Sequence, residues 1–183
     1  MRGVRAVVLV EGVSDQAAVE ALARRRGRDL DSEGVLVVPM GGAQAIGRFL
    51  DRFGPRGLGI GLAGLCDAAE EDEFRRGLER AGLGSDLTRT AMEELGFYVC
   101  DADLEDELIR ALGVAAVERI AEEQGELGSF RTFQKQPAQQ ERSHEQQLRR
   151  WMGNRKIRYA PLLVDALEPA AVPRPLDLVL AHL

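Results

Sequence analysis

Short apolar runs alternate with stretches of helical spacing over the first 112 residues of the chain. Continuous apolar runs of four to eight residues are typical of parallel strands that are covered on both faces. Four such runs predict strands over Val4–Val10, Val35–Val38, Leu58–Leu65 and Gly96–Cys100. Helices are predicted between and after them, over Asp15–Arg26 with Ser14 as N-cap, Ala43–Phe53, Glu70–Ala81, and from the cap Asp103 to Leu112. This alternation indicates βαβ units and an α/β fold with a mostly parallel four-stranded sheet.

The pattern changes near Gly113, after which only helices are expected. They are predicted over Val114–Gln124, Gln139–Met152, Ile157–Leu167 and Leu176–Leu183, and the glutamine-rich piece Gln134–Gln147 could form a loop before its helix begins. We find no internal repeat. We therefore predict one compact domain, in which residues 1–112 form an α/β core and residues 113–183 form a helical C-terminal extension packed on that core.

Composition narrows the class of protein. The longest apolar run, Gly57–Cys66, has about ten residues, roughly half of what a transmembrane helix needs. Glu11 ends the first apolar run too early for a secretory signal, so we expect a cytoplasmic protein without membrane contact. The two cysteines, Cys66 and Cys100, offer no disulfide framework and are expected as buried, reduced thiols.

The net charge of −6 conceals an uneven distribution along the chain. The segment from Arg131 to Arg158 holds eight basic and two acidic residues and is therefore net +6. The other 16 basic and 28 acidic residues leave the rest of the chain at −12. Such a division suits a protein that places acids around a metal and bases along a phosphate backbone, and it also suits two solvated faces.

Carboxylates follow three of the predicted strands. Glu11 follows the first strand, Asp67 the third, and Asp101, Asp103 and Glu105 the fourth, while Asp15 lies one helical turn after Glu11. In open parallel sheets, ligand sites form beyond the carboxyl ends of the strands, and oxygen ligands of this type select Mg²⁺ or Mn²⁺. Gly12, next to Glu11, would allow a sharp turn and a close approach of a phosphate or metal. Acids are also common at helix N-termini, which alone would explain Asp15, Glu70, Asp103 and Glu105.

Several motifs, in order along the chain, resemble those of a known family. The run Val8-Leu9-Val10-Glu11-Gly12-Val13-Ser14-Asp15 resembles the opening motif of TOPRIM domains, and the aspartate four residues after the glutamate resembles the overcoming-lysogenization-defect (OLD) nucleases in particular. Four later segments are similar to that family, namely the glycine turn Val37–Gly42, Asp67 after the third strand, Asp103–Asp106, and the basic helix start Arg155–Ala160. The resemblance covers nearly the whole chain and implies a Rossmann-like TOPRIM fold, here as a stand-alone chain like the C-terminal part of OLD endonucleases.

The resemblance also implies a site. Metal ligation would fall to Glu11, Asp15, Asp67, Asp103 and Glu105, and two divalent ions, Mg²⁺ or Mn²⁺, would support phosphodiester hydrolysis. Glu11 and Lys156 would be catalytic, with Lys156 neutralising charge on the scissile phosphate. The chain departs from the family at Ala69, where TOPRIM domains carry a second aspartate, and Glu70, Glu71 or Asp72 could substitute for it.

These features leave more than one function open. The first is a metal-dependent nuclease, a hydrolase acting on DNA, with RNA as an alternative substrate. The second is a TOPRIM-like nucleic-acid-binding or regulatory module with a weakened site, which Ala69 favours. The chain has no GxxxxGK[ST] loop, so an ATPase would be a separate partner, and a homodimer is a further expectation from the family. Nucleic acid is expected along Arg149, Arg150, Arg155, Lys156 and Arg158, with Trp151 and Tyr159 either stacking on bases or packing in the core.

Overall fold

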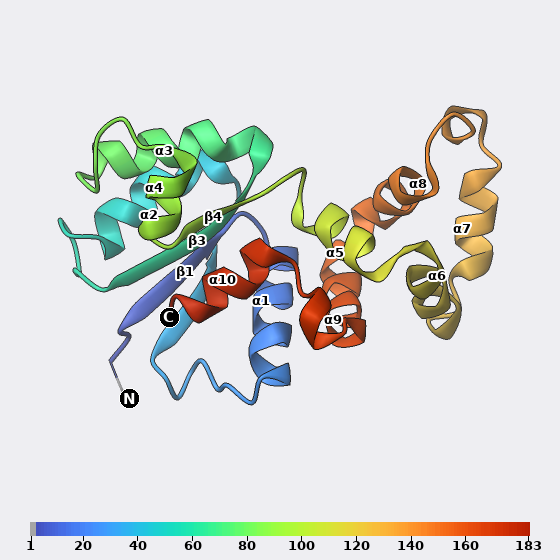
Figure 1. Ribbon diagram of the computed structural model, residues 1–183, viewed down its shortest axis with the longest axis horizontal. Helices are drawn as coiled ribbons and strands as arrows, with labels where there is room; N and C mark the ends of the chain where they lie inside the picture. The colour runs from blue at the N-terminus through green and yellow to red at the C-terminus, as the bar shows by residue number, and fades with distance from the viewer. Residues whose placement is uncertain (1–2) are drawn as a thin grey trace.

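A four-stranded sheet lies at the centre of the protein, for which a computed structural model describes residues 3–183 (Figure 1). All of its strands are parallel, in the order β2-β1-β3-β4. Their bounds are Ala6–Val10 for β1, Val35–Pro39 for β2, Gly61–Asp67 for β3 and Phe97–Cys100 for β4. The predicted α/β fold class is confirmed, and every strand presents its carboxyl end at the same edge of the sheet.

Apolar side chains of each strand enter two separate cores, one on either face of the sheet. In β1, Ala6, Val8 and Val10 point into one core while Val7 and Leu9 point into the other. All five are buried, which explains why the strand reads as an unbroken apolar run rather than an alternating one.

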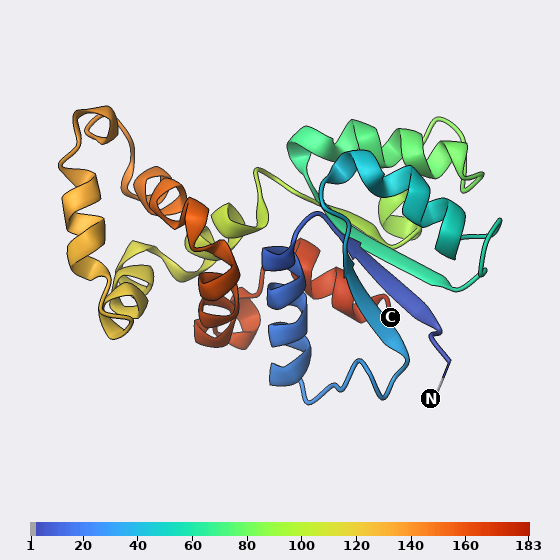
Figure 2. The ribbon, with the colours of Figure 1, turned by 180° about the vertical axis from the view of Figure 1, so that it is seen from behind.

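Helices cover both faces. On one side lie α2 (Ile46–Phe53), α3 (Glu71–Arg80) and α4 (Arg89–Glu94), and on the other lie α1 (Val13–Arg25) and α10 (Arg174–Ala181) (Figures 1 and 2). The last helix, α10, packs against β4 and β3, so the end of the chain covers the part of this face that α1 does not reach.

After β4 the chain leaves the sheet and builds a helical arm, which extends to the right in Figure 1. Its helices are α5 (Leu104–Leu112), α6 (Val114–Glu123), α7 (Leu127–Gln134) and α8 (His144–Trp151). Helix α9 (Lys156–Ala166) returns to the sheet and packs along α1. Because α5 contacts α8 and α9, interactions cross the expected boundary at residues 112 and 113, and the division into core and extension stays a prediction.

Several predicted element bounds were wrong for local reasons. Ser14 is not the cap of α1, because Gly12 holds that position and Asp15 closes the turn by accepting from the Gly12 N–H at 2.9 Å. Helix α8 begins at His144 rather than Gln139, since Ser143 and Gln146 form a reciprocal capping box. The short helices α4 and α7 were not predicted.

No helix within residues 3–183 combines the length and the apolarity that crossing a lipid bilayer requires.

Candidate metal centre

Glu11 and Asp67 meet at the carboxyl edge of the sheet because their strands are hydrogen-bonded neighbours. Leu9 of β1 pairs in register with Gly64 of β3, so the two acids that end these strands lie side by side. The backbone N–H of Asp67 donates to Oε1 of Glu11 at 3.1 Å. This bond orients the Glu11 carboxylate before any ligand binds.

The backbone of Glu11 is also hydrogen-bonded to the loop that follows β2, the other strand beside β1. The N–H groups of Gly41 and Gly42 donate to the Glu11 carbonyl at 3.0 and 3.1 Å. Both glycines have positive φ, 78° and 116°, a region that L side chains rarely adopt. Gly12 itself is extended, with φ of −138°, which any residue adopts, so the sharp turn expected at Gly12 is not found. The glycine turn expected at Gly41 and Gly42 is present.

Glu70 completes a group of three acids with Glu11 and Asp67. Each offers a carboxylate oxygen, and these oxygens lie within 4.8 Å of one another, the one such group among residues 3–183. We call these three residues the open triad. Glu70 lies in the 3₁₀ turn Ala68–Glu70, which brings it back beside Asp67, while Ala69 is exposed.

The two other candidate substitutes for the missing aspartate are occupied elsewhere. Glu71 accepts from Arg89 at 2.5 Å, and Asp72 accepts from Arg75 at 2.5 Å. Of the three acids proposed to replace the aspartate at position 69, only Glu70 enters the triad.

The remaining predicted ligands, Asp15, Asp103 and Glu105, form the deeper side of the same centre. Asp15 is in the first turn of α1, and Asp103 caps α5 by accepting from the Asp106 N–H at 2.8 Å. The side chains of Asp103 and Glu105 are only 9% and 5% exposed. The charges of all three raise the pKa of Asp67, so the five predicted ligands lie in one electrostatic neighbourhood.

Cations from α8 and α9 neutralise part of this deeper side. Lys156 Nζ donates to Glu105 Oε2 at 2.9 Å, and Arg149 reaches Asp103 Oδ2 through Nε at 2.7 Å and Nη2 at 2.6 Å. Burial works against the ionised form of Lys156, but the hydrogen bond and charge of Glu105 outweigh it and raise the pKa of the lysine. We call Arg149–Asp103 and Lys156–Glu105 the two inner ion pairs.

Burial and mutual repulsion disfavour the charged forms of Glu11, Asp15 and Asp67, and the charge of Lys156 only partly offsets this for Glu11 and Asp15. Burial, with added repulsion from Glu11 and Asp103, raises the pKa of Asp67 to about 8. Burial also raises the pKa of Asp15 to about 6, against the hydrogen bond from Gly12, and raises that of Glu11. A divalent cation would relieve this repulsion, and three carboxylates form a hard oxygen donor set, so the residues fit Mg²⁺ or Mn²⁺.

Asp101 lies outside the centre, although it too follows a strand. Its side chain is 72% exposed, and its nearest cations are Arg110 at 3.9 Å and Arg89 at 4.0 Å. The acid after β4 that enters the centre is Asp103, two residues later.

The predicted nucleic-acid residues line two adjoining grooves, and most of them already have acidic partners. Arg149 and Lys156 point inward to the inner ion pairs, while Arg155 and Arg158 both pair with Glu126, at 3.6 and 3.3 Å. Arg150 is exposed and has no hydrogen bond or ion pair within the described chain.

Trp151 and Tyr159 are core residues rather than stacking platforms. Both are buried, 3% and 1% exposed, and their rings lie 5.6 Å apart between centroids. Tyr159 also donates its hydroxyl to Glu126 at 2.7 Å.

Two grooves adjoin the centre and share Gly153 and Lys156. The first, of about 430 Å³, is lined by Asp103, Arg142, Gln146, Arg149 and Arg150 in addition to the shared pair. The second, of about 670 Å³, runs between the start of α1 at Val13 and the start of α9. Arg142 was not among the expected residues, although the helix predicted over Gln139–Met152 would have placed it two turns before Arg149; in the structure it precedes α8 and still lines the groove.

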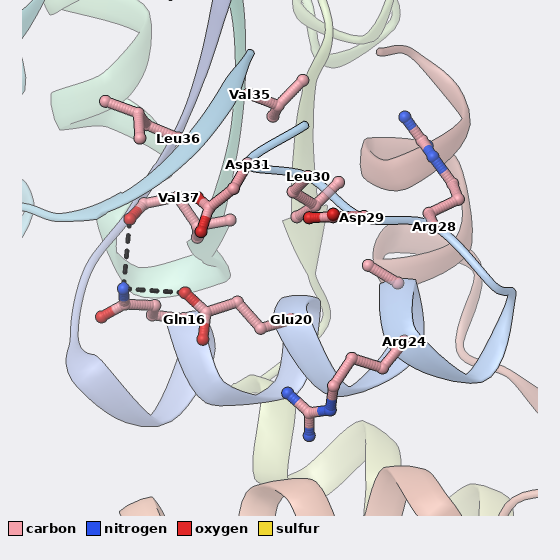
Figure 3. A pocket seen from close by; sticks show the side chains of 11 residues that line it. Gln16, Glu20, Arg24, Arg28, Asp29, Leu30, Asp31, Val35, Leu36 and Val37 are labelled. Carbon is pink, nitrogen blue, oxygen red and sulfur yellow. Dashed lines mark hydrogen bonds between the residues drawn. The ribbon is translucent and has the colours of Figure 1, made fainter. Parts of the chain in front are cut away.

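A further pocket of about 410 Å³ lies apart from these residues, between α1 and the edge strand β2 (Figure 3). There Gln16 donates to Glu20 at 2.9 Å and to the Val37 carbonyl at 3.3 Å. None of the predicted site residues lines it, so the chemistry expected from the sequence is confined to the carboxyl edge of the sheet.

Comparisons with known proteins give one matching family model and several similar solved structures. The sequence model of the overcoming lysogenization defect protein-like TOPRIM domain matches residues 4–68, which include Glu11, Asp15 and Asp67. A comparison with curated proteins gave no match.

Solved structures with the same fold are C-terminal regions of OLD proteins. One, from Xanthomonas campestris pv. campestris, has a TM-score of 0.75 and 26% identity, covering 97% of this chain and 91% of the other. Another, from Burkholderia pseudomallei, has a TM-score of 0.74 and 22% identity, covering 98% and 96%. Residues 4–68 thus match the OLD-like TOPRIM domain, and the fold of the whole described chain is similar to that of C-terminal regions of OLD proteins.

Proposed function

We propose that the protein is a divalent-metal-dependent nuclease that hydrolyses phosphodiester bonds, in DNA rather than RNA. The observation that carries this proposal is the open triad, three carboxylates within 4.8 Å of one another at the carboxyl edge of a TOPRIM sheet. An OLD-like TOPRIM domain has a metal-binding fold of the nuclease type, and the triad gives that fold a complete set of three oxygen donors.

Each residue of the centre has a distinct task in this proposal. Glu11, Asp67 and Glu70 would hold Mg²⁺ or Mn²⁺, which supplies a nucleophilic water at neutral pH and offsets charge on the phosphate. Asp67, whose pKa is about 8, releases its proton when its carboxylate becomes a ligand. Lys156, at the junction of the two grooves, is placed to offset charge on a phosphate that enters either of them.

The groove lined by Arg142, Arg149 and Arg150 is the proposed path of the nucleic acid backbone. It combines three guanidinium groups with Lys156 beside an acidic centre, so phosphates are attracted along the groove and repelled from the carboxylates. Four of the eight basic residues between Arg131 and Arg158 line this groove.

A second function is favoured by Ala69. Since the usual second aspartate is missing there, the protein could instead bind nucleic acid without cutting it and act as a regulatory module beside an ATPase partner. The two functions differ in one measurable property, metal-dependent strand cleavage. The separate ATPase partner and the homodimer stay predictions from the family.

The test is a cleavage assay on supercoiled plasmid, single-stranded DNA and RNA, each in Mg²⁺, Mn²⁺ and EDTA. Glu11→Gln and Asp67→Asn remove a charge while keeping the shape of the side chain, and Glu71→Gln, outside the triad, is the matched control. Cleavage that needs metal and survives only in the control supports the nuclease. Binding without cleavage in any metal contradicts it and favours the regulatory module.

A further inference from the structure

The deeper side of the metal centre differs from the open triad in one respect, which is that its acids already have cationic partners. Asp103 contacts Arg149 at 2.6 Å and Glu105 contacts Lys156 at 2.9 Å. Both carboxylates are almost fully buried, so the electrostatic attraction within each ion pair is stronger than it would be in water. While the inner ion pairs are intact, Arg149 and Lys156 offset the negative charge of both acids, which weakens the attraction of these acids for a divalent ion.

The cations of the inner ion pairs are much more accessible than the acids. The side chains of Arg149 and Lys156 are 42% and 35% exposed, against 9% and 5% for their partners. Both cations also line the groove of about 430 Å³ that holds Arg142 and Arg150. A phosphate in this groove therefore meets the exposed side chains of Arg149 and Lys156, whereas Asp103, which also lines the groove, exposes only 9% of its side chain.

The two cations also come from a different part of the chain than the triad. Arg149 is in α8 and Lys156 begins α9, while Glu11 follows β1, Asp67 ends β3 and Glu70 lies in the 3₁₀ turn after it. Helices α8 and α9 thus supply removable counter-charges to a centre whose acids come from the sheet edge, from α1 and from α5.

We propose that the inner ion pairs make occupation of the centre sequential. One divalent ion binds the open triad in the free protein, and a second is admitted by Asp103 and Glu105 only when a phosphate backbone in the groove takes Arg149 and Lys156 as its partners. This inference rests on the proposed function and deepens it, because it makes nucleic acid the factor that completes the metal site.

The competition is balanced in charge. When the phosphates gain Arg149 and Lys156, the two acids lose two positive partners, and one divalent cation restores them. Without that cation, two buried carboxylates would be left uncompensated, which is costly. Nucleic acid and the second ion therefore each raise the affinity of the protein for the other by the same factor.

The test counts Mn²⁺ bound per protein by equilibrium dialysis, with and without a phosphorothioate single-stranded oligonucleotide, after subtracting the ions held by the oligonucleotide alone. The wild-type protein should bind one ion alone and two with the oligonucleotide. The double variant Arg149→Gln/Lys156→Gln should bind two ions without any oligonucleotide, and circular dichroism should show that it keeps the native fold.

Arg150→Gln is the matched control, since Arg150 lines the same groove but has no acidic partner. It should bind the oligonucleotide more weakly yet keep one ion in its absence. Two ions on the free wild-type protein, one ion even with the oligonucleotide, or two ions on free Arg150→Gln would each overturn the inference. If the double variant does not fold, the Mn²⁺ counts of the wild-type protein with and without the oligonucleotide are sufficient to test the inference. Failure of the metal site on which the proposed function rests looks different, because the wild-type protein would then bind no Mn²⁺ in either state; failure of the nuclease itself is read from the cleavage assay.

Discussion

The backbone N–H of Asp67 donates to the carboxylate of Glu11 across 3.1 Å, so the end of β3 holds the acid that follows β1. A main-chain donor has little freedom to move in a paired strand, and the Glu11 carboxylate is therefore oriented before a ligand arrives. Asp67 contributes twice, through its backbone to Glu11 and through its own carboxylate to the open triad. Such preorganisation lowers the ordering cost of binding.

We expect Glu11→Gln to lose metal binding without losing the fold. The amide oxygen of glutamine can still accept from the Asp67 N–H, but it brings no charge, so the affinity for Mn²⁺ should fall at least about tenfold. Isothermal titration calorimetry measures this directly. Asp101→Asn is the control, because Asp101 also follows a strand yet is 72% exposed and outside the triad. Equal loss in both variants would contradict the assignment of the triad.

The metal-free protein should lose stability as the pH rises from about 4 to 8. The pKa of Asp67 is raised from 3.8 to about 8 on folding. Between these values the native state binds a proton that the unfolded state does not, so the free energy of unfolding falls with rising pH. The full penalty is reached above about pH 8. Thermal melts in EDTA at several pH values measure this slope.

Asp67→Asn removes the titrating group responsible for that slope. At pH 8 without metal the variant should be more stable than the wild-type protein, by on the order of 1–2 kcal/mol after allowance for solvent screening. At pH 4 the two should be similar, because the wild-type aspartic acid is then neutral. A wild-type protein that gains stability between pH 4 and 8, or a variant that keeps the wild-type slope, would refute the raised pKa of Asp67.

Periodicity predicted the sheet because the signal is local. Each strand is an apolar run that packs on both faces of the sheet; Val7 and Val8, for example, enter opposite cores. Such runs can be recognised in the sequence without knowledge of the tertiary structure. The acids at strand ends could be found for the same reason, since Glu11 and Asp67 directly follow such runs.

The parts of the site that could not be predicted from the sequence depend on contacts between residues far apart in the chain. Glu70 could not be chosen over Glu71 from sequence, because the choice is made by Arg89, which is 18 residues away and pairs with Glu71. Likewise, Arg149 and Arg155 have the same chemistry and lie in one basic segment, but Asp103 holds the first and Glu126 the second. Helix α7 was missed because its single fully buried residue, Phe130, gives no repeating pattern.

Glu70 should prove to be the functional replacement for the aspartate that is missing at position 69. Glu70→Gln should weaken Mn²⁺ binding at least about tenfold, since it removes one of three charged donors from the triad. Glu71→Gln and Asp72→Asn should bind Mn²⁺ like the wild-type protein, because both acids pair with arginines outside the centre. If Glu71→Gln or Asp72→Asn were the more damaging change, the triad would be assigned to the wrong acid.

Trp151 and Arg150 are adjacent in sequence, yet their substitution should affect different properties. Trp151 is 3% exposed, packs on Phe130 at 5.4 Å between ring centroids, and donates its indole N–H to Ser129 at 3.3 Å. Trp151→Ala should therefore cost about 3–5 kcal/mol of stability, measured by urea unfolding. Arg150→Gln exchanges an exposed side chain without partners and should leave stability within about 0.5 kcal/mol.

The affinity for nucleic acid should depend on Arg150 and not on Trp151. Arg150→Gln should weaken oligonucleotide binding and reduce the slope of log K against log salt by about one, because one phosphate contact is lost. At a temperature where Trp151→Ala is still folded, its salt slope should equal that of the wild-type protein, since a buried indole releases no counterions. A reduced slope in folded Trp151→Ala would place the indole on the nucleic-acid path, and an unchanged slope in Arg150→Gln would move that path away from the groove beside Asp103.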